Sequence, residues 1–109
     1  MSKLISYNAG TIIAKEGEPA KKLFILVEGR VGIYKNNSLI VEFEKEGEII
    51  GEMSLILKKP RTAEIRALTN VRLLEVAGEL DEIVKQYPDI SKKIIHSLAE
   101  RLAKATDRV

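Results

Sequence analysis

The sequence predicts a mainly β fold that ends in helices. Short runs of β-branched and aliphatic residues, separated by turn residues, fill the chain as far as about Val76, and helical apolar spacing takes over from Ala77. Short strands at this spacing are typical of a small antiparallel sandwich or barrel. A length of 109 residues suits a single hydrophobic core. We therefore expect one domain over residues 1–109, with a strand-built barrel at about 4–76 and helices at about 78–108.

Six runs of the first part are expected to be strands, because each is rich in β-formers and bounded by Gly, Pro, Asn or charged turn residues. They are Thr11–Ala14, Leu23–Glu28, Val31–Tyr34, Leu39–Phe43, Arg61–Ala67 and Val71–Val76. Asn36 and Asn37 stand between two of these runs, and asparagine tolerates a positive φ. The pair is expected to form a hairpin tip.

Two helices are expected after the strands. The first carries apolar residues at helical spacing up to Tyr87, and Pro88 interrupts the pattern. The second begins at Pro88 or Asp89 and runs through Arg108. These helices leave no room for a DNA-recognition element, so we expect no direct DNA binding by this chain.

The second predicted helix carries two apolar stripes. One is a seam with three- and four-residue spacing, typical of paired helices, formed by Ile95, Leu98, Leu102, Ala105 and Val109. The other, Ile90 and Ile94, is better placed to dock on the strands. The seam covers barely two heptads, so it needs support from the rest of the domain. It either pairs two copies in a homodimer or packs on the domain's own core.

The stretch from Ile50 to Ala63 concentrates anion-binding chemistry. Gly51 stands at the expected start of a short helix, where free N–H groups favour a negative charge. Arg61 offers a planar fork of donors that suits a phosphate. Glu52 would repel a phosphate but would accept a hydrogen bond from a sugar hydroxyl. A ligand with both groups, such as a nucleotide, would satisfy the pair.

This stretch resembles the phosphate-binding cassette of cyclic nucleotide-binding domains, in the superfamily of the catabolite activator and the regulatory subunits of protein kinase. The matching residues are Gly51-Glu52, Leu55 and Pro60-Arg61-Thr62-Ala63, with Ile50, Met53 and Ser54 as mild departures. Gly10-Thr11, Gly17 and Phe24 to Gly29 match upstream, and Tyr87 to Ile90 match downstream. The resemblance spans nearly the whole chain.

The resemblance implies a double-stranded β-helix, or jelly-roll, barrel that binds cyclic AMP or cyclic GMP as a regulatory sensor. The module would be the effector domain of a transcriptional regulator or a stand-alone sensor. Arg61 and backbone N–H groups of Met53, Ser54 or Ala63 would hold the phosphate, and Glu52 would accept the ribose 2′-hydroxyl. Thr62 would lie near the phosphate and the base, and Thr106 would contact the base in the partner's site. The implied ligand-binding residues are Gly51, Glu52, Met53, Ser54, Arg61, Thr62, Ala63 and Thr106.

Composition argues against other classes of protein. The chain has no cysteine, which excludes a disulfide, a thiolate metal site and a cysteine-ligated iron–sulfur cluster. Its single histidine, His96, cannot supply a cupin-type metal site and is a poor candidate for a haem ligand. We therefore expect a binding module without metal, rather than an enzyme.

The formal net charge of +2 is too small to argue for nucleic acid or a membrane, and no long apolar run is present. A cytoplasmic location is expected. The alternative is a degenerate domain that has lost nucleotide binding and serves dimerisation or protein docking.

Overall fold

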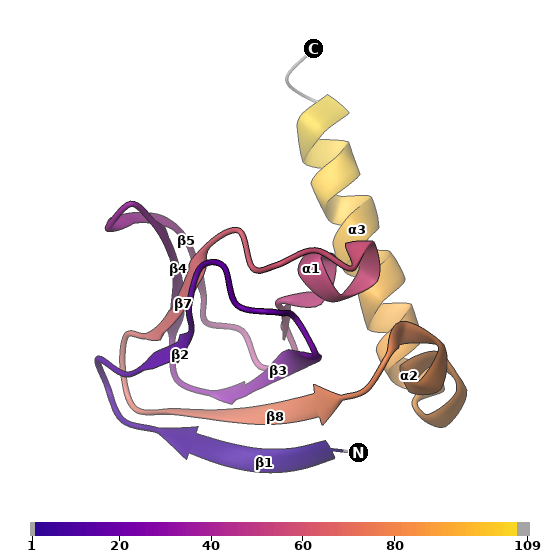
Figure 1. The fold of residues 1–109 in the computed structure, drawn as a ribbon, viewed down its shortest axis with the longest axis horizontal. Helices are drawn as coiled ribbons and strands as arrows, with labels where there is room; N and C mark the ends of the chain where they lie inside the picture. Colours follow the sequence, from indigo (N-terminus) through magenta and orange to yellow (C-terminus); the bar gives the residue numbers. More distant parts are fainter. Residues whose placement is uncertain (1, 107–109) are drawn as a thin grey trace.

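The computed structural model describes the backbone of residues 2–106 and side-chain burial as far as residue 104. These residues form two antiparallel sheets and three helices (Figure 1). The strands are β1 (Ser2–Tyr7), β2 (Ile12–Ala14), β3 (Lys22–Glu28), β4 (Val31–Lys35), β5 (Ser38–Phe43), β6 (Ile49–Ile50), β7 (Glu64–Ala67) and β8 (Val71–Ala77). The helices are α1 (Glu52–Leu57), α2 (Leu80–Gln86) and α3 (Pro88–Thr106).

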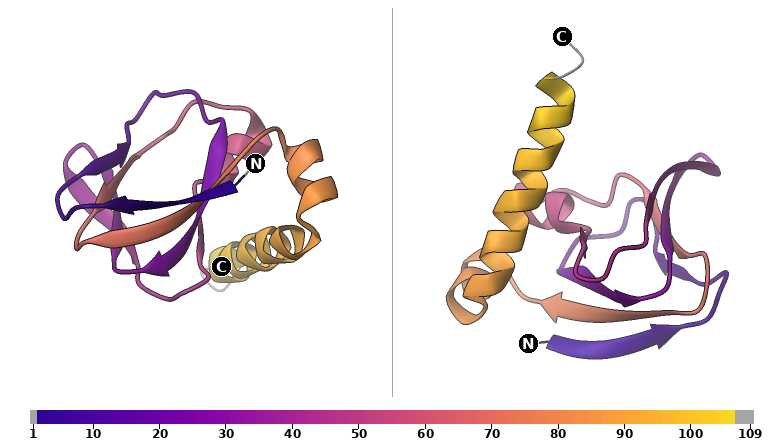
Figure 2. Two further views of the ribbon diagram at one scale, coloured as in Figure 1. Left: turned by 90° about the horizontal axis from the view of Figure 1, so that it is seen from below. Right: turned by 180° about the vertical axis from the view of Figure 1, so that it is seen from behind.

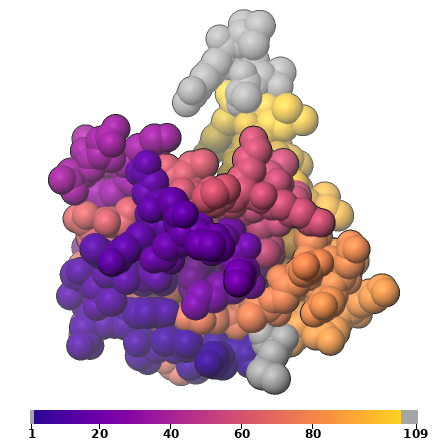
Figure 3. All heavy atoms as spheres, viewed as in Figure 1, coloured from indigo at the N-terminus to yellow at the C-terminus, as the bar shows by residue number. Residues whose placement is uncertain are grey.

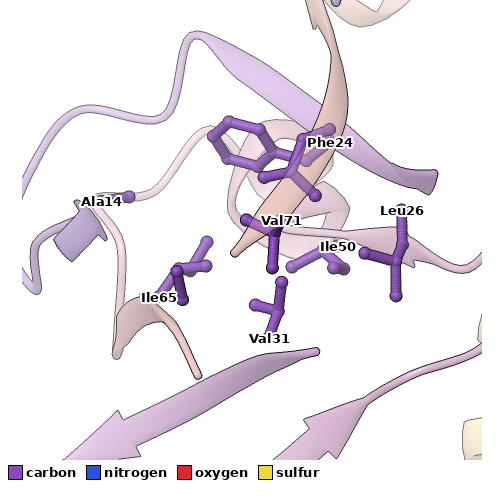
Figure 4. Close-up of a cluster of buried hydrophobic side chains, with 9 residues drawn as sticks. Ala14, Phe24, Leu26, Val31, Ile50, Ile65 and Val71 are labelled. Carbon is purple, nitrogen blue, oxygen red and sulfur yellow. The ribbon is translucent and has the colours of Figure 1, made fainter. Parts of the chain in front are cut away.

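The two sheets face each other across an apolar core. Their strand orders are β1-β8-β3-β6 and β2-β7-β4-β5. Both sheets contribute to the core between them, which is formed by Ala14, Phe24, Leu26, Val31, Ile50, Ile65, Ala67, Val71 and Leu73 (Figure 4). The predicted jelly-roll fold is confirmed as an open roll of two sheets rather than a closed barrel.

Strand β3 is buried on both faces, which explains its continuous apolar run from Leu23 to Leu26. Phe24 and Leu26 point between the sheets, whereas Leu23 and Ile25 belong to a second cluster under the helices. That second cluster also contains Ile49, Leu55, Val76, Ile83, Ile90 and Ile94. The helices therefore dock on the outer face of the sheet whose inner face builds the first core.

Two strands were not predicted from the sequence. Strand β1 has few β-branched residues, and pairing with β8 from Ser2↔Val76 to Tyr7↔Val71 makes it a strand. Strand β6 has only two residues, too few for a visible period.

One predicted strand begins later than expected. Arg61 to Ala63 were placed in a strand, but β7 begins at Glu64. The reason is that the backbone of Arg61 pairs with a loop: its N–H donates to the carbonyl of Glu18 at 2.8 Å, and its carbonyl accepts from the N–H of Gly17 at 2.7 Å.

The hairpin tip predicted at Asn36 and Asn37 is confirmed. Both residues have positive φ, 52° and 63°, and they form the two-residue turn between β4 and β5.

Helix α3 uses its two apolar stripes differently. Ile90 and Ile94 are buried against the strands and α2, as predicted. On the seam, Ile95 and Leu102 are 67% and 69% exposed, but Leu98 packs partly against the second cluster. The side chain of Ala105, like Val109, lies outside the described residues. The seam is therefore divided between the domain's own core and an exposed face. No helix among the described residues combines the length and apolar character needed to cross a bilayer.

We expect Ile94→Ala to lower the free energy of unfolding by about 2–5 kcal/mol, because it removes buried methyl groups from the second cluster. The matched control, Ile95→Ala, changes an exposed neighbour and should stay within about 0.5 kcal/mol. Urea unfolding at low protein concentration measures both. Equal losses for the two variants would contradict the orientation of α3.

Candidate functional site

A cavity of about 710 Å³ lies between the cassette and α3. Its walls also include the end of β5, the loop residues 45–48, Ile33 of β4 and Ile65 of β7. The space-filling view shows a depression bordered by the β4–β5 hairpin and by the rising end of α3 (Figure 3). Seen from behind, α3 runs along one side of α1 (Figure 2, right).

The cavity gathers seven of the eight residues that the sequence singled out for the ligand. They are Gly51, Glu52, Met53, Ser54, Arg61, Thr62 and Ala63. Arg61 and Glu52 are buried, whereas Met53 and Thr62 are exposed at the rim. The eighth residue, Thr106, is the last described residue of α3, and its side chain lies outside the described part of the chain.

Arg61 is held in place by uncharged groups. Its Nη1 donates to the carbonyl of Gly51 at 2.6 Å, and its Nη2 donates to the carbonyl of Lys22 at 2.5 Å. Its guanidinium carbon lies 5.7 Å from the centroid of the Phe24 ring, within the range of a cation–π contact. The orientation of the guanidinium is therefore set by two backbone carbonyls and an aromatic ring.

Arg61 is also a buried cation that forms no ion pair with any described residue. Burial lowers its pKa, and the nearby charges of Glu18 and Glu52 oppose that shift. An arginine keeps its proton even so. Because two of its five N–H donors are used by carbonyls, donors remain for an anion in the cavity.

Glu52 is the first residue of α1 and is fully buried. Its Oε1 accepts a hydrogen bond from Ser97 Oγ at 3.1 Å and forms an ion pair with Arg101 Nη2 at 2.6 Å, both on α3. Its Oε2 is buried and has no hydrogen-bond partner among the described residues. Leaving a buried acceptor unsatisfied costs about 1–3 kcal/mol. A hydroxyl donor in the cavity would remove that penalty.

Ser97 and Arg101 were not predicted from the sequence. The two lie four residues apart, so they share one face of α3. That spacing was visible in the sequence, but nothing local showed that this face crosses α1. His96, also on the cavity wall, is exposed and pairs with Glu100 at 2.7 Å, in keeping with its interpretation as an ordinary helix side chain.

The first turn of α1 offers further donors. Its N–H groups have no partners within the helix, and Gly51 before it provides no side-chain cap. With six residues, α1 has only a small dipole, so these N–H groups supplement Arg61.

Two features require glycine at position 51: the backbone conformation there and the closeness of the Arg61 guanidinium. Its φ is +82°, a left-handed conformation that other residues adopt at a cost. A Cβ at this position would stand 2.5 Å from Arg61 Nη1. Any side chain here would therefore displace the guanidinium.

Two small sheets thus carry one cavity that holds a buried cation, Arg61, and a carboxylate oxygen of Glu52 without a donor among the described residues. The sequence profile of the cyclic nucleotide-binding domain matches residues 4–87. The chain belongs to the cyclic nucleotide-binding domain family.

Individual proteins agree with this assignment. The chain is 33% identical over 67 residues to cGMP-dependent protein kinase 2 of Rattus norvegicus, a match that covers 62% of the chain and 9% of the kinase. A solved structure described as cAMP-bound PfPKA-R (141–441) superposes with a TM-score of 0.75 at 31% identity, over 98% of this chain and 36% of that one.

The catabolite activator protein of Thermus thermophilus superposes with a TM-score of 0.81 at 22% identity, over 96% of this chain and 52% of that one, a likeness of fold. The chain spans about a third or less of the length of the first curated relatives that it matches.

We expect Gly51→Ala to lower the affinity for an anionic ligand of the cavity, because the new methyl group displaces Arg61. Gly10→Ala is the matched control: Gly10 has a similar φ of +87°, but a Cβ added there would have nothing within 4 Å. Both variants should lose about 1–2 kcal/mol of folding free energy from backbone strain. Calorimetric titration with cyclic AMP and cyclic GMP separates them, and equal affinities would contradict the displacement.

Proposed function

We propose that this chain binds a cyclic nucleotide, cyclic AMP or cyclic GMP, as a regulatory sensor module. One observation carries the proposal. Among the described residues, the same cavity holds a buried cation without a carboxylate partner, Arg61, and a buried carboxylate oxygen without a donor, Glu52 Oε2. A ring phosphate beside a ribose hydroxyl complements this pair of groups.

In the proposed complex, Arg61 binds the cyclic phosphate together with backbone N–H groups of Met53, Ser54 or Ala63. Glu52 accepts the 2′-hydroxyl through the oxygen that α3 leaves free, while Arg101 keeps the other oxygen. Glu52 is thus tolerated beside an anion because its charge is balanced by Arg101. Thr62 is exposed at the rim, and in the proposed complex it would lie near the phosphate and the base.

Both nucleotides remain candidates. One relative is a cGMP-dependent kinase and one structural neighbour is cAMP-bound, and these similarities support either ligand. The relatives are longer than this chain, which supports a role as the effector domain of a larger regulator, such as a transcriptional regulator. A separate sensor is the other form of the proposal. Catalysis and direct DNA contact are not part of the proposal.

We further propose a homodimer through α3. Ile95 and Leu102 form an exposed apolar stripe on the face that does not dock on the strands. Thr106, on the continuation of this helix, remains the proposed contact to the base in the partner's site.

Arg61→Ala should weaken binding of the cyclic nucleotide by about 2–5 kcal/mol, tens- to thousands-fold, because it removes the buried partner of the phosphate. Arg61→Lys should also weaken it, since an ammonium group cannot keep both carbonyl contacts and a two-point phosphate contact. Calorimetric titration of the wild type and both variants measures this. Arg66→Lys, a change outside the cavity, is the control and should leave affinity unchanged.

Equal affinities for wild type and Arg61→Ala would refute the role of Arg61. The alternative, a degenerate docking domain, predicts that neither nucleotide raises the melting temperature. A ligand at about 100 times its dissociation constant should add about 2.7 kcal/mol of stability, an effect that thermal unfolding detects readily.

Ile95→Lys should weaken self-association at least about tenfold, because it places a charge on the exposed stripe of α3. Ile40→Lys, which changes an exposed apolar residue of β5, is the control. Sedimentation equilibrium gives the dimer constants. A wild-type chain that stays monomeric at high concentration would end the dimer proposal.

A further inference from the structure

Three polar side chains meet at the inner face of the β1-β8-β3 sheet, outside the ligand cavity. Glu75 of β8 is 4% exposed. Its Oε1 accepts from Lys22 Nζ at 3.0 Å, and its Oε2 accepts from the hydroxyl of Tyr7. We name Tyr7, Lys22 and Glu75 the inner polar cluster.

Only one of the two charges in the inner polar cluster is buried: the side chain of Lys22 is 41% exposed, whereas that of Glu75 is 5% exposed. Such a pair contributes little to stability, because water screens the charge of the ammonium group and the buried carboxylate has lost its hydration. Burial raises the pKa of Tyr7, and its hydrogen bond to Glu75 and the charge of Glu75 add to that shift. Tyr7 therefore remains a protonated donor to Glu75 at neutral pH. Stability alone gives little reason for this cluster.

The position of the cluster connects it to Arg61. Glu75 pairs with Phe24 in the β3–β8 register, so the two side chains are cross-strand neighbours. Lys22 Nζ and the guanidinium carbon of Arg61 each lie 5.7 Å from the centroid of the Phe24 ring. The carbonyl of Lys22 is also the acceptor for Arg61 Nη2. Lys22, a member of the cluster, therefore contacts Arg61 through its carbonyl, and the ring of Phe24 lies near both Lys22 and Arg61.

Lys22 is the first residue of β3, where a strand has the fewest ladder contacts to hold its backbone. It pairs with Ala77, the last residue of β8, so this is the end of the β3–β8 ladder. The ammonium group of Lys22 links this strand end to buried Glu75, and Tyr7 of β1 donates to the other oxygen of Glu75.

We propose that the inner polar cluster is a positioning unit for Arg61. Tyr7 orients Glu75, Glu75 holds Lys22, and the carbonyl of Lys22 together with the Phe24 ring orients the guanidinium toward the cavity. The expected effect on ligand affinity rests on the proposed binding of a cyclic nucleotide. The expected effect on structure, a less ordered Arg61 when the cluster is removed, does not depend on any ligand.

The first test replaces the whole cluster by apolar residues of similar size, Tyr7→Phe, Lys22→Met and Glu75→Leu. Thermal unfolding should show a folded protein with a melting temperature close to that of the wild type. Affinity for the nucleotide that the wild type binds should fall about 3- to 30-fold, the range expected for coupling between neighbouring groups. Unchanged affinity in the folded triple variant would overturn the proposal.

The second test distinguishes positioning from a general loss of structure. In an Arg61→Lys background the triple replacement should cause little further loss of affinity, because the guanidinium that it positions is already absent. A full additional loss would mean that the cluster acts by another route, and would overturn the proposal. The control pair Glu64→Gln and Arg66→Met removes an ion pair of β7 that does not line the cavity, and should leave affinity unchanged.

A measurement without ligand keeps the inference testable even if the chain binds no nucleotide. The Nε–H signal of Arg61 in a ¹H–¹⁵N spectrum, assigned by its loss in Arg61→Lys, should shift or broaden in the Glu75→Gln variant and stay in place in Glu64→Gln. Failure of the wild type to bind either nucleotide would refute the proposed function alone. An unmoved Arg61 signal in Glu75→Gln would refute the positioning role alone.

Discussion

The structure of the site depends on how one buried guanidinium is held. Arg61 is fixed by the carbonyls of Gly51 and Lys22 and by the ring of Phe24, with no carboxylate of the described residues in contact. Neutral acceptors orient a cation without cancelling its charge, so its attraction for an anion in the cavity is preserved. The surrounding elements follow from this requirement: a glycine at residue 51, a strand end at Lys22 and an irregular segment before β7.

The second constraint is that Glu52, a residue of the cassette, is also a contact point for α3. Ser97 and Arg101 contact one oxygen of this carboxylate, and the other oxygen has no donor within the described part of the chain. A ligand hydroxyl that binds the free oxygen would change the charge distribution on the oxygen that holds α3. Leu98 is the last described residue of α3 that packs against the second cluster, and Arg101 contacts Glu52 one turn of helix further on. In the proposed complex, the ligand and α3 would therefore contact the same carboxylate.

Much of the fold was predictable because its signals are local. The apolar run of β3, the Asn36-Asn37 turn and the switch to helical spacing after Ala77 each lie within a few neighbouring residues. Strand β1 was missed because it depends on pairing with β8, at the other end of the strand-rich part of the chain. The start of β7 was placed too early because Arg61 pairs with the loop at Gly17 and Glu18. In the site, Ser97 and Arg101 were missed for a similar reason: they approach Glu52 only through the packing of α3.

The sequence by itself determined the chemistry of the cassette, since Gly51, Glu52 and Arg61 lie within one short stretch of the chain. A carboxylate can only accept hydrogen bonds and a guanidinium can only donate them. Tertiary structure alone decided which polar groups of the cassette have no partner within the described protein and are therefore available to a ligand. Whether a buried cation is neutralised, and whether a carboxylate oxygen finds a donor, depends on residues that approach from distant strands and helices. Burial makes these contacts energetically decisive, because water no longer competes for them. For that reason the unpaired charge of Arg61 and the free oxygen of Glu52, as the described residues leave them, are properties of the fold.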